Sequence, residues 1–345
     1  MLRRLVIGGG SLAVIGLAKN AGKTTVLNAL AWEAARSGTS IGLASVGVDG
    51  EERDVWSGRE KPPVFVPSGG LAATAAPLLE DRPGDWEITA ITSFHSSLGP
   101  IAIARALRET KVKLAGIITA EQIRETETLF LEQGVRLMLV DGAYDRKAAA
   151  SPWVTHGAIC VAGAVMGRTL GEVVHRTEEA VRVLTLPGAE DPVLIRAGET
   201  ARATGCLVGV RGGRVEELPF PSLLSRPDRL REHLSSGGWS GLAFPGALTD
   251  RALEHLSESG LPLVLCLRDP TRCFASLRSL RRFTRAGGQI FCLRALSLKA
   301  VAVNPVSPDG WSFDPEEMKE RIREVCGSVP VLDVRREADP RPLSE

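Results

Sequence analysis

The chain has 345 residues, of which 44% are hydrophobic and 24% are charged, a composition typical of a globular protein with about two domains. Its formal net charge of +1 argues against a nucleic acid or a membrane surface as the partner. The six cysteines are scattered without a Cys-x-x-Cys pair, which argues against a zinc site or a disulfide framework and favours free thiols in a reducing compartment.

The N-terminal half alternates short apolar runs with helical patterns. Strands are predicted at residues 12–15, 41–46, 64–66, 86–91, 114–118, 137–140 and 158–162. Helices are predicted at residues 26–35, 71–79, 101–109, 121–132 and 170–184. This regular alternation predicts an α/β fold with a parallel sheet covered by helices on both faces, and the continuous apolar runs are typical of strands buried on both sides.

The pattern changes after about residue 186. Residues 187–202 are rich in Pro, Gly, Ala and charge and are interpreted as a connection. A hairpin is predicted next, because two short apolar runs flank a glycine turn at 211–214. Strands at 241–244, 263–267, 290–293, 300–303 and 329–334 and a helix at 315–326 are expected to follow. We therefore expect one domain at 1–186, an α/β portion at 187–334 and a flexible tail at 335–345.

The N-terminus resembles a signal peptide in one respect, because Arg3 and Arg4 precede an apolar stretch. Glycines interrupt that stretch at 8–10, and it continues directly into the motif at 16–25, so we expect no cleaved leader. No run of about 18 apolar residues occurs in the sequence, so no membrane span is predicted. We expect a cytoplasmic protein.

The most informative motif follows the first predicted strand and precedes the first predicted helix. It consists of Lys19, Asn20, Ala21, Gly22, Lys23, Thr24 and Thr25. The order of strand, small-residue turn and helix is the context that a phosphate-binding loop requires, because backbone N–H groups and the helix N-terminus then face one phosphate. Lys23 is expected to reach the β- and γ-phosphates, and the Thr24 hydroxyl to bind Mg²⁺. Residues 1–186 are therefore predicted to be a P-loop NTPase-like nucleotide-binding domain.

The motif departs from the usual spacing. A standard loop has a glycine five residues before the glycine of the Gly-Lys pair, but Leu17 occupies that position and Gly16 comes one residue earlier. The sequence thus predicts binding of Mg²⁺-ATP, does not exclude GTP, and leaves open whether the protein is an ATPase. It contains no Asn-Lys-x-Asp sequence, so no motif reads guanine.

Two aspartates are candidates for chemistry on the nucleotide together with Lys23. Asp141 ends an apolar strand, the position from which a carboxylate holds Mg²⁺ opposite Thr24 in nucleotide-binding α/β proteins. Asp49 follows the second predicted strand and either positions water or Mg²⁺ or belongs to a solvated acidic loop, with Glu51 as the next candidate.

Other charged or turn-rich segments each allow two interpretations. Lys19 either strengthens anion binding, even on a neighbouring subunit's nucleotide in a homodimer, or is an exposed turn residue. Residues 145–147 either supply positive charge to phosphates or form a surface cluster. The segments 268–271 and 304–310 follow apolar runs and either bind a ligand or partner or only form tight turns.

Two resemblances to known families add expectations. Residues 19–25 resemble the loop of molybdopterin-guanine-dinucleotide biosynthesis adaptor proteins. A longer resemblance is to the P-loop subunit of the lysine 5,6-aminomutase reactivase (KamB type), whose segments are similar to residues 16–25, 45–51, 140–147 and 304–308. These segments extend from near the N-terminus to residue 308, so the second resemblance spans most of the chain.

The longer resemblance implies a nucleotide-binding reactivating factor that acts with a MutS-like ATPase partner subunit. Such a factor helps to exchange damaged cobalamin for adenosylcobalamin on lysine 5,6-aminomutase, an enzyme of lysine fermentation. Two alternatives stay open. One is a GTP-binding adaptor for cofactor biosynthesis, and the other is an ATP-dependent small-molecule ligase or kinase whose second half binds the substrate.

Overall fold

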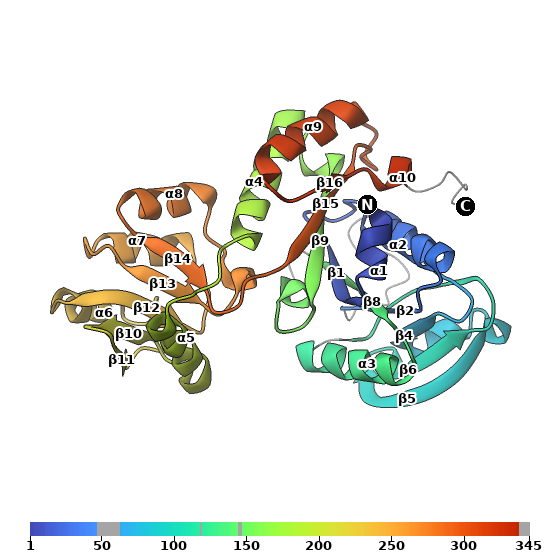
Figure 1. The fold of residues 1–345 in the computed structure, drawn as a ribbon, viewed down its shortest axis with the longest axis horizontal. Coiled ribbons are helices and arrows are strands. Elements are labelled where there is room, and N and C mark those ends of the chain that lie inside the picture. Colours follow the sequence, from blue (N-terminus) through green and yellow to red (C-terminus); the bar gives the residue numbers. More distant parts are fainter. Residues whose placement is uncertain (47–62, 118, 144–146, 338–345) are drawn as a thin grey trace. The chain divides into compact units, whose positions relative to one another are not determined.

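The computed structural model describes residues 1–46, 63–117, 119–143 and 147–337. The chain divides into two compact units, one formed by Met1–Glu178 with Leu298–Glu345 and the other by Glu179–Ser297. Each unit contains its own β-sheet and helices, which are labelled in Figure 1.

The described part of the first unit is built on a nine-stranded sheet with the strand order β16-β15-β9-β1-β8-β2-β4-β6-β5. Its strands are β1 Gly10–Gly16, β2 Ile41–Ser45, β4 Leu71–Ala75, β5 Trp86–Ser96, β6 Gly99–Ala106, β8 Leu137–Ala143, β9 Gly157–Gly163, β15 Leu298–Asn304 and β16 Val331–Leu332. The strands from β16 through β4 are parallel to one another. The strand β6 is antiparallel to both β4 and β5. The predicted α/β class with a mostly parallel sheet is therefore confirmed.

Helices cover both faces of this sheet (Figure 1). They are α1 Leu2–Ile7, α2 Lys23–Ser37, α3 Ala120–Glu132, α9 Pro315–Cys326, α10 Val334–Glu337 and α4 Leu170–Leu184, which contains the boundary between the units. Leu43 of β2 shares a core cluster with Leu30 of α2. Its neighbour Gly42 faces the other way, where an added Cβ would lie 2.3 Å from the ring of Phe130 in α3. The two faces of β2 are thus buried by different helices.

Local signals explain where the main helices begin and end. Thr119 and Gln122 form a capping box at the start of α3. Gly38 follows the last residue of α2; its positive φ of 66° suits a glycine, and its N–H donates to the carbonyls of Ala34 and Ala35. On the α2 side, Trp32 stacks on Phe65 with ring centroids 3.8 Å apart. Phe65 belongs to a two-stranded antiparallel sheet of β3 Val64–Val66 and β7 Thr110–Val112.

Two predicted helices in the first unit are wrong. Residues 71–79 form β4 followed by a 3-10 turn, and most of residues 101–109 form β6. Both segments are rich in alanine, which favours helix by intrinsic propensity. In the fold, β4 pairs with β2 and β6 and all five of its residues are buried, so pairing within the sheet outweighs propensity. The strand predicted at 114–118 is reduced to an isolated bridge between Ile117 and Val46.

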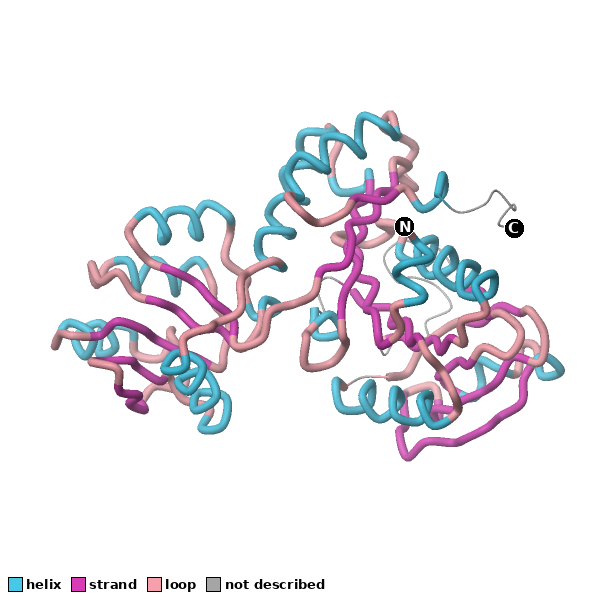
Figure 2. The backbone as a smooth tube through the Cα atoms, viewed as in Figure 1, coloured by secondary structure: helices cyan, strands magenta, loops and turns pink. Residues whose placement is uncertain are grey.

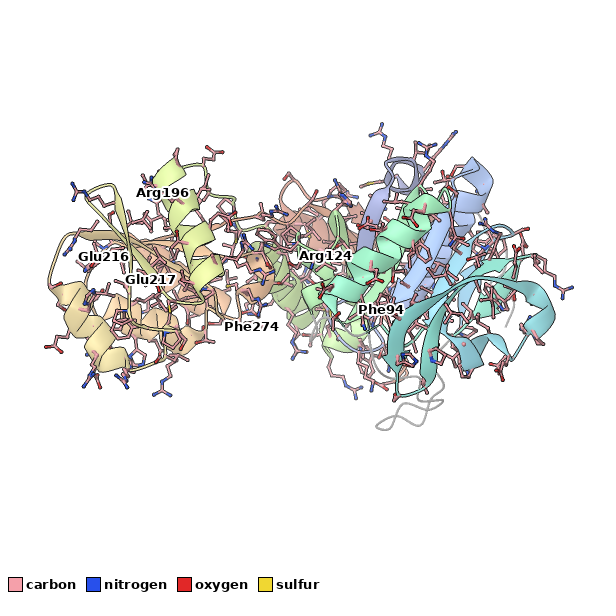
Figure 3. All side chains as sticks on the ribbon, turned by 90° about the horizontal axis from the view of Figure 1, so that it is seen from below. Phe94, Arg124, Arg196, Glu216, Glu217 and Phe274 are labelled. Carbon is pink, nitrogen blue, oxygen red and sulfur yellow. The ribbon has the colours of Figure 1, made fainter. Side chains whose placement is uncertain are left out.

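The strand β5 lies at one edge of the sheet and is longer than predicted. Its second half alternates in exposure, with Thr92 and Phe94 buried and Ile91 and Ser93 exposed. Figure 3 labels Phe94 on this strand and also shows Arg124 on α3. The alternation is typical of a strand that packs one face on the core and leaves the other to solvent.

The described second unit contains a five-stranded sheet with the order β11-β10-β12-β13-β14. Its strands are labelled in Figure 1 and drawn in magenta in Figure 2. Its elements are α5 Pro192–Thr204, β10 Val208–Arg211, β11 Arg214–Glu217, α6 Pro227–Ser235, β12 Trp239–Phe244, α7 Asp250–Ser257, β13 Val264–Leu267, α8 Leu277–Arg285 and β14 Gln289–Cys292. β10 and β11 form the predicted hairpin, and β12, β13 and β14 are parallel. Figure 3 labels Arg196 on α5, Glu216 and Glu217 on β11, and Phe274 ahead of α8.

The connection predicted at 187–202 is largely helical. Residues Pro192–Thr204 form α5, with the Asp191 side chain accepting a hydrogen bond from Val193 N at 2.8 Å. Pro192 occupies the first turn and Gly205, with a φ of 73°, follows the last turn. These are ordinary signals of a helix start and stop, and the high content of Pro, Gly and charge concealed them.

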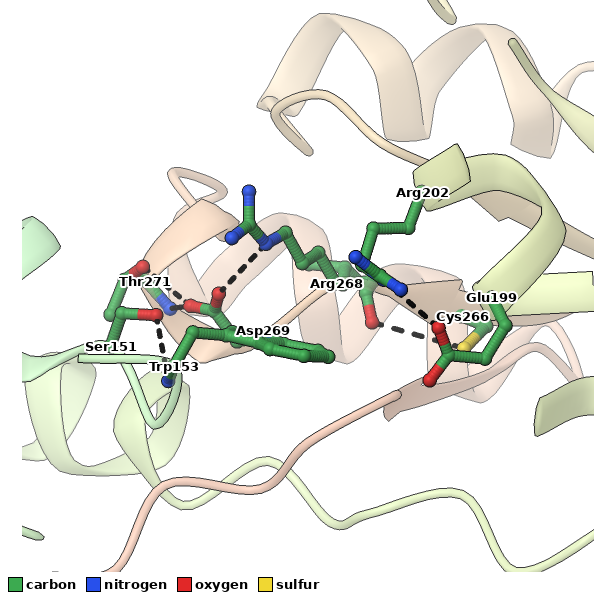
Figure 4. Close-up of polar contacts among 9 residues, drawn as sticks. Ser151, Trp153, Glu199, Arg202, Cys266, Arg268, Asp269 and Thr271 are labelled. Carbon is green, nitrogen blue, oxygen red and sulfur yellow. Dashed lines mark hydrogen bonds and ion pairs between the residues drawn. The ribbon is translucent and has the colours of Figure 1, made fainter. Parts of the chain in front are cut away.

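The segment 268–271 forms a tight capped turn, as one of its two interpretations expects. Asp269 is buried and accepts a hydrogen bond from Thr271 N at 2.9 Å, and its carboxylate lies 3.9 Å from Arg268 Nε (Figure 4). The same view shows the ion pair between Arg202 and Glu199 of α5, at 2.9 Å.

The boundaries of the two units differ from the expected ones. The predicted second portion extends to residue 334, but β15, α9 and β16 belong to the first unit, because β15 pairs with β9 and β16 pairs with β15. The second unit is therefore an insertion, which the chain enters within α4 and leaves ahead of β15. Of the tail predicted at 335–345, residues 335–337 belong to α10, and the remainder lies outside the described residues.

Candidate functional site

The segment 17–22 lies at the carboxyl edge of the parallel sheet, between the end of β1 and the start of α2. β1 is central, with β8 on one side and β9 on the other. Leu17 N donates to Val161 O at 2.9 Å, so the pairing of β1 with β9 continues one residue into the loop. Ala21 N donates to Ala18 O at 3.3 Å, which closes a turn within the loop. In open α/β sheets, ligands bind at this edge.

Two residues of the loop have a left-handed backbone conformation. Asn20 has a φ of 60° and Gly22 a φ of 110°. Asparagine and glycine tolerate this region best, and its occurrence in a loop lets neighbouring N–H groups converge on one concave face. Gly22 is the N-cap of α2, so the free N–H groups of the first turn, which contains Thr24 and Thr25, face the same end of the helix. This combination is suited to an anion.

Gly16 explains the unusual spacing of the motif. It is the last residue of β1, and an added Cβ there would lie 3.0 Å from Lys23 Cγ and 3.3 Å from Lys23 Cδ. The Lys23 side chain therefore passes directly over Gly16 on its way out of the loop. The glycine one residue earlier than usual keeps this passage open, and Leu17 takes part in strand pairing instead.

Two residues from neighbouring strands hold the loop from the β9 and β15 side. Asn304, at the end of β15, donates from Nδ2 to Ala21 O at 3.2 Å. An added Cβ on Gly163, at the end of β9, would lie 2.7 Å from Ala21 Cα. Ala21 is fully buried as a result, with 0% of its surface exposed. The inner part of the loop is thus fixed by contacts with two strands.

Asp141 lies on β8, the strand next to β1 on the other side. It is paired in register with Val14 of β1 and with Ser45 of β2, and its carbonyl accepts a hydrogen bond from Val46 N at 2.9 Å. Only 6% of Asp141 is exposed. Because neighbouring strands are about 4.8 Å apart, the Asp141 backbone lies beside Val14, two residues before β1 ends at Gly16.

The loop follows β1, and Asp141 lies on the adjacent strand β8, which continues two residues beyond the predicted strand end, to Ala143. The predicted roles of these residues stay predictions. Lys23, Thr24 and Thr25 are half-buried at the start of α2, and Lys19 and Asn20 are exposed at the tip of the loop. Asp49 and its neighbour Glu51 lie outside the described residues, and so do residues 145–146 and the side chain of Lys147.

Sequence reasoning missed the contributions of Gly163 and Asn304. Both were visible as residues at the end of predicted apolar runs, and the 304–310 segment was noted as a turn. The missing information was the strand order, since only the adjacency of β15, β9 and β1 brings both residues against the loop. The available signal was that both residues follow predicted parallel strands, whose carboxyl ends line the ligand-binding edge of such a sheet.

The candidate metal ligands of the site are the Thr24 hydroxyl and the Asp141 carboxylate, both of which offer oxygen. Among the described residues, no group of three His, Cys, Asp or Glu side chains is arranged to hold a metal ion. Thr24 and Asp141 fit Mg²⁺, which needs oxygen ligands and usually keeps several waters while binding substrate phosphates. All described helices are too short or too polar to cross a membrane.

Comparison of the chain with family models, with curated proteins and with solved structures gives no match. The function of the site is therefore inferred from the loop, the helix start and Asp141. Backbone N–H groups at a helix start and a nearby lysine are features that suit an anion such as phosphate, and the adjacent strand carries a buried carboxylate.

Proposed function

We propose that the first unit is a P-loop NTPase-like domain that binds a nucleoside triphosphate, ATP or GTP, with Mg²⁺. The observation that carries this proposal is the loop itself, in which the left-handed Gly22 leads into α2 and the Lys23 side chain passes over Gly16. Phosphate oxygens need several N–H donors and a nearby cation, and the loop supplies both. Residues 19–25 contact the phosphates in this proposal.

The bound Mg²⁺ would be held by the Thr24 hydroxyl and, directly or through water, by Asp141. The ion neutralises charge on the phosphates, and Lys23 adds a second positive charge there. If hydrolysis occurs, Lys23 and Asp141 act on the transferred phosphate, with Asp49 as the candidate that positions water. The burial of Asp141 supports this role, because a buried carboxylate needs a cation or hydrogen-bond donors to stabilise its charge.

We further propose that the protein is a reactivating factor that helps to exchange damaged cobalamin for adenosylcobalamin on lysine 5,6-aminomutase, with a MutS-like ATPase as partner. Support comes from the resemblance of residues 16–25, 140–147 and 304–308, since described parts of all three lie at one edge of the sheet. Nucleotide state can bias two conformations of such a loop, and differential binding to a client then supplies the free energy for opening it. A cytoplasmic location fits this role.

Nucleotide titration of the wild type and of Lys23→Ala tests the first proposal. We expect Lys23→Ala to bind Mg²⁺-ATP and Mg²⁺-GTP about 10- to 100-fold more weakly, because it loses charge-assisted hydrogen bonds to phosphate. Lys299→Ala is the matched control, since Lys299 is exposed and lies at the opposite end of β15 from Asn304. Equal binding by the wild type and Lys23→Ala would overturn the proposal.

Two further variants test the metal role. Thr24→Ala and Asp141→Asn should weaken nucleotide binding when Mg²⁺ is present and change it little in EDTA, because their contribution acts through the ion. A loss of the same size in EDTA would contradict metal binding by these residues.

The reactivation proposal needs its own assay. Lysine 5,6-aminomutase inactivated with bound damaged cobalamin is mixed with this protein, the partner ATPase, Mg²⁺-ATP and fresh adenosylcobalamin. Recovery that depends on ATP and is lost in Lys23→Ala supports the reactivase. No recovery, combined with a preference for GTP, favours the adaptor, and substrate-dependent turnover without a protein partner favours the ligase or kinase.

A further inference from the structure

The peptide group between Ala21 and Gly22 is held by Asn304 in a specific orientation. Asn304 Nδ2 donates to Ala21 O at 3.2 Å, and Asn304 Oδ1 accepts from Val306 N at 3.4 Å. The same side chain packs against Gly22, because an added Cβ on Gly22 would lie 3.0 Å from Asn304 Nδ2. Asn304 thus contacts both residues that share the peptide.

A planar trans peptide links the direction of its carbonyl to that of its N–H, which point opposite ways. All described peptide bonds are trans. Because Asn304 holds the Ala21 carbonyl, the Gly22 N–H must therefore point away from the Asn304 side chain. In the proposed nucleotide complex, a phosphate is bound on that side.

We propose that Asn304 is a positioning residue that sets the Gly22 N–H as a phosphate donor, an inference that rests on the proposed nucleotide binding. Asparagine suits this role because it is both donor and acceptor. Val306 N donates to Oδ1 of the Asn304 side chain and so fixes the acceptor end of that side-chain amide. Pro305, between Asn304 and Val306, has no N–H that could compete for Oδ1. The donor end is thereby directed to Ala21 O.

The nearly isosteric Asn304→Asp tests the donor role directly. It keeps the acceptor for Val306 N and the packing on Gly22, but it places an anionic oxygen against the Ala21 carbonyl. Asn304→Ala removes the bond without adding repulsion. We expect affinity for Mg²⁺-ATP and Mg²⁺-GTP to fall about 3- to 10-fold in Asn304→Ala and more in Asn304→Asp.

Asn28→Ala is the matched control for a merely structural effect. Asn28 also makes a side-chain hydrogen bond to the backbone, accepting from Phe65 N at 2.8 Å, but that bond joins α2 to β3 away from the loop. It should reduce thermal stability to an extent similar to Asn304→Ala while leaving nucleotide affinity unchanged. A loss of affinity in this control equal to that in Asn304→Ala would overturn the positioning role.

NMR distinguishes a change in the orientation of the Gly22 N–H from a general loss of folding stability. Labelling with ¹³C′-alanine and ¹⁵N-glycine selects Ala–Gly pairs, including Ala21–Gly22. In the wild type, Mg²⁺-ATP or inorganic tripolyphosphate should move the Gly22 amide proton downfield, as expected for a charge-assisted hydrogen bond. The shift should shrink in both Asn304 variants and persist in Asn28→Ala.

The outcomes distinguish the two proposals. If the wild type binds nucleotide and both Asn304 variants bind equally well with an unchanged Gly22 shift, the positioning role is wrong and nucleotide binding stands. If the wild type binds neither nucleotide nor tripolyphosphate, both proposals fail. Weaker binding with a reduced Gly22 shift in the Asn304 variants alone supports both.

Discussion

Gly163 lies against the loop at 17–22, for which we propose phosphate binding, and Gly163→Ala tests whether this close packing is needed for binding. Its backbone is extended, with φ −111° and ψ 151°, so alanine is accommodated there without backbone strain. The new Cβ would lie 2.7 Å from Ala21 Cα, 2.8 Å from Ala21 O and 3.1 Å from Ala21 C. All three are backbone atoms, so no side-chain rotation can relieve the contact.

The size of the effect follows from these distances. Ordinary van der Waals contact of a Cβ begins at 3.4 Å, so the loop must move by roughly 0.7 Å or more. Overpacking of this kind costs about 1–3 kcal/mol. If the loop absorbs the displacement, the cost appears in nucleotide binding as a loss of affinity of about 5- to 150-fold.

Calorimetric titration with Mg²⁺-ATP and Mg²⁺-GTP measures the loss of affinity, and thermal unfolding measures any loss of stability. We expect Gly163→Ala to remain folded and to bind weakly. Gly171→Ala is the control, because an added Cβ there meets only Thr169 Oγ1, at 4.0 Å. Wild-type affinity in Gly163→Ala would refute the steric reasoning, and so would an equal loss in the control.

Two further predictions concern stability and reactivity. Hydrogen bonds from Thr110 and Arg108 lower the pKa of Asp85 below its ordinary value of 3.8. The ionised Asp85 therefore adds to the free energy of unfolding above pH 3.8, and this stabilisation is lost as the pH falls through the lowered pKa. Urea titrations should therefore show Asp85→Asn less stable than wild type at pH 7, with the difference shrinking below about pH 3.8; a pH-independent difference would contradict this. Burial raises the pKa of Cys266 to about 12, so iodoacetamide at pH 8 should modify half-buried Cys206 first, and mass spectrometry showing Cys266 modified first would contradict this.

The sequence predicted the strand, turn and helix around the loop because their order is local along the chain, whereas β8 extends two residues beyond the predicted strand end at Asp141. The motif at 19–25 lies between the apolar run 12–15 and a helical pattern, and a strand followed by a turn and helix is recognisable without tertiary contacts. The offset of Gly16 could be seen but not explained, since its reason is the path of the Lys23 side chain.

The errors arose where tertiary contacts decide. Leu71–Ala75 has a composition that suits a helix, and only its position between β2 and β6 makes it a strand. The return of β15 to the first sheet was equally hidden, because its apolar run resembles those of the second unit. Periodicity identifies a strand but not the sheet that it joins.

The hydrogen bond between Asn304 and Ala21 joins residues 283 positions apart in sequence, which has a consequence for synthesis on the ribosome. At about 5–20 residues per second, some 14–57 seconds separate the emergence of the two partners. During that interval the strands β9 and β15 are missing from the sheet for part or all of the time. The loop then lacks the contacts of Gly163 and Asn304 with Ala21. On the proposed nucleotide binding, a nascent chain stalled before residue 304 should therefore bind nucleotide poorly. Such non-local closure is also expected to make refolding slow.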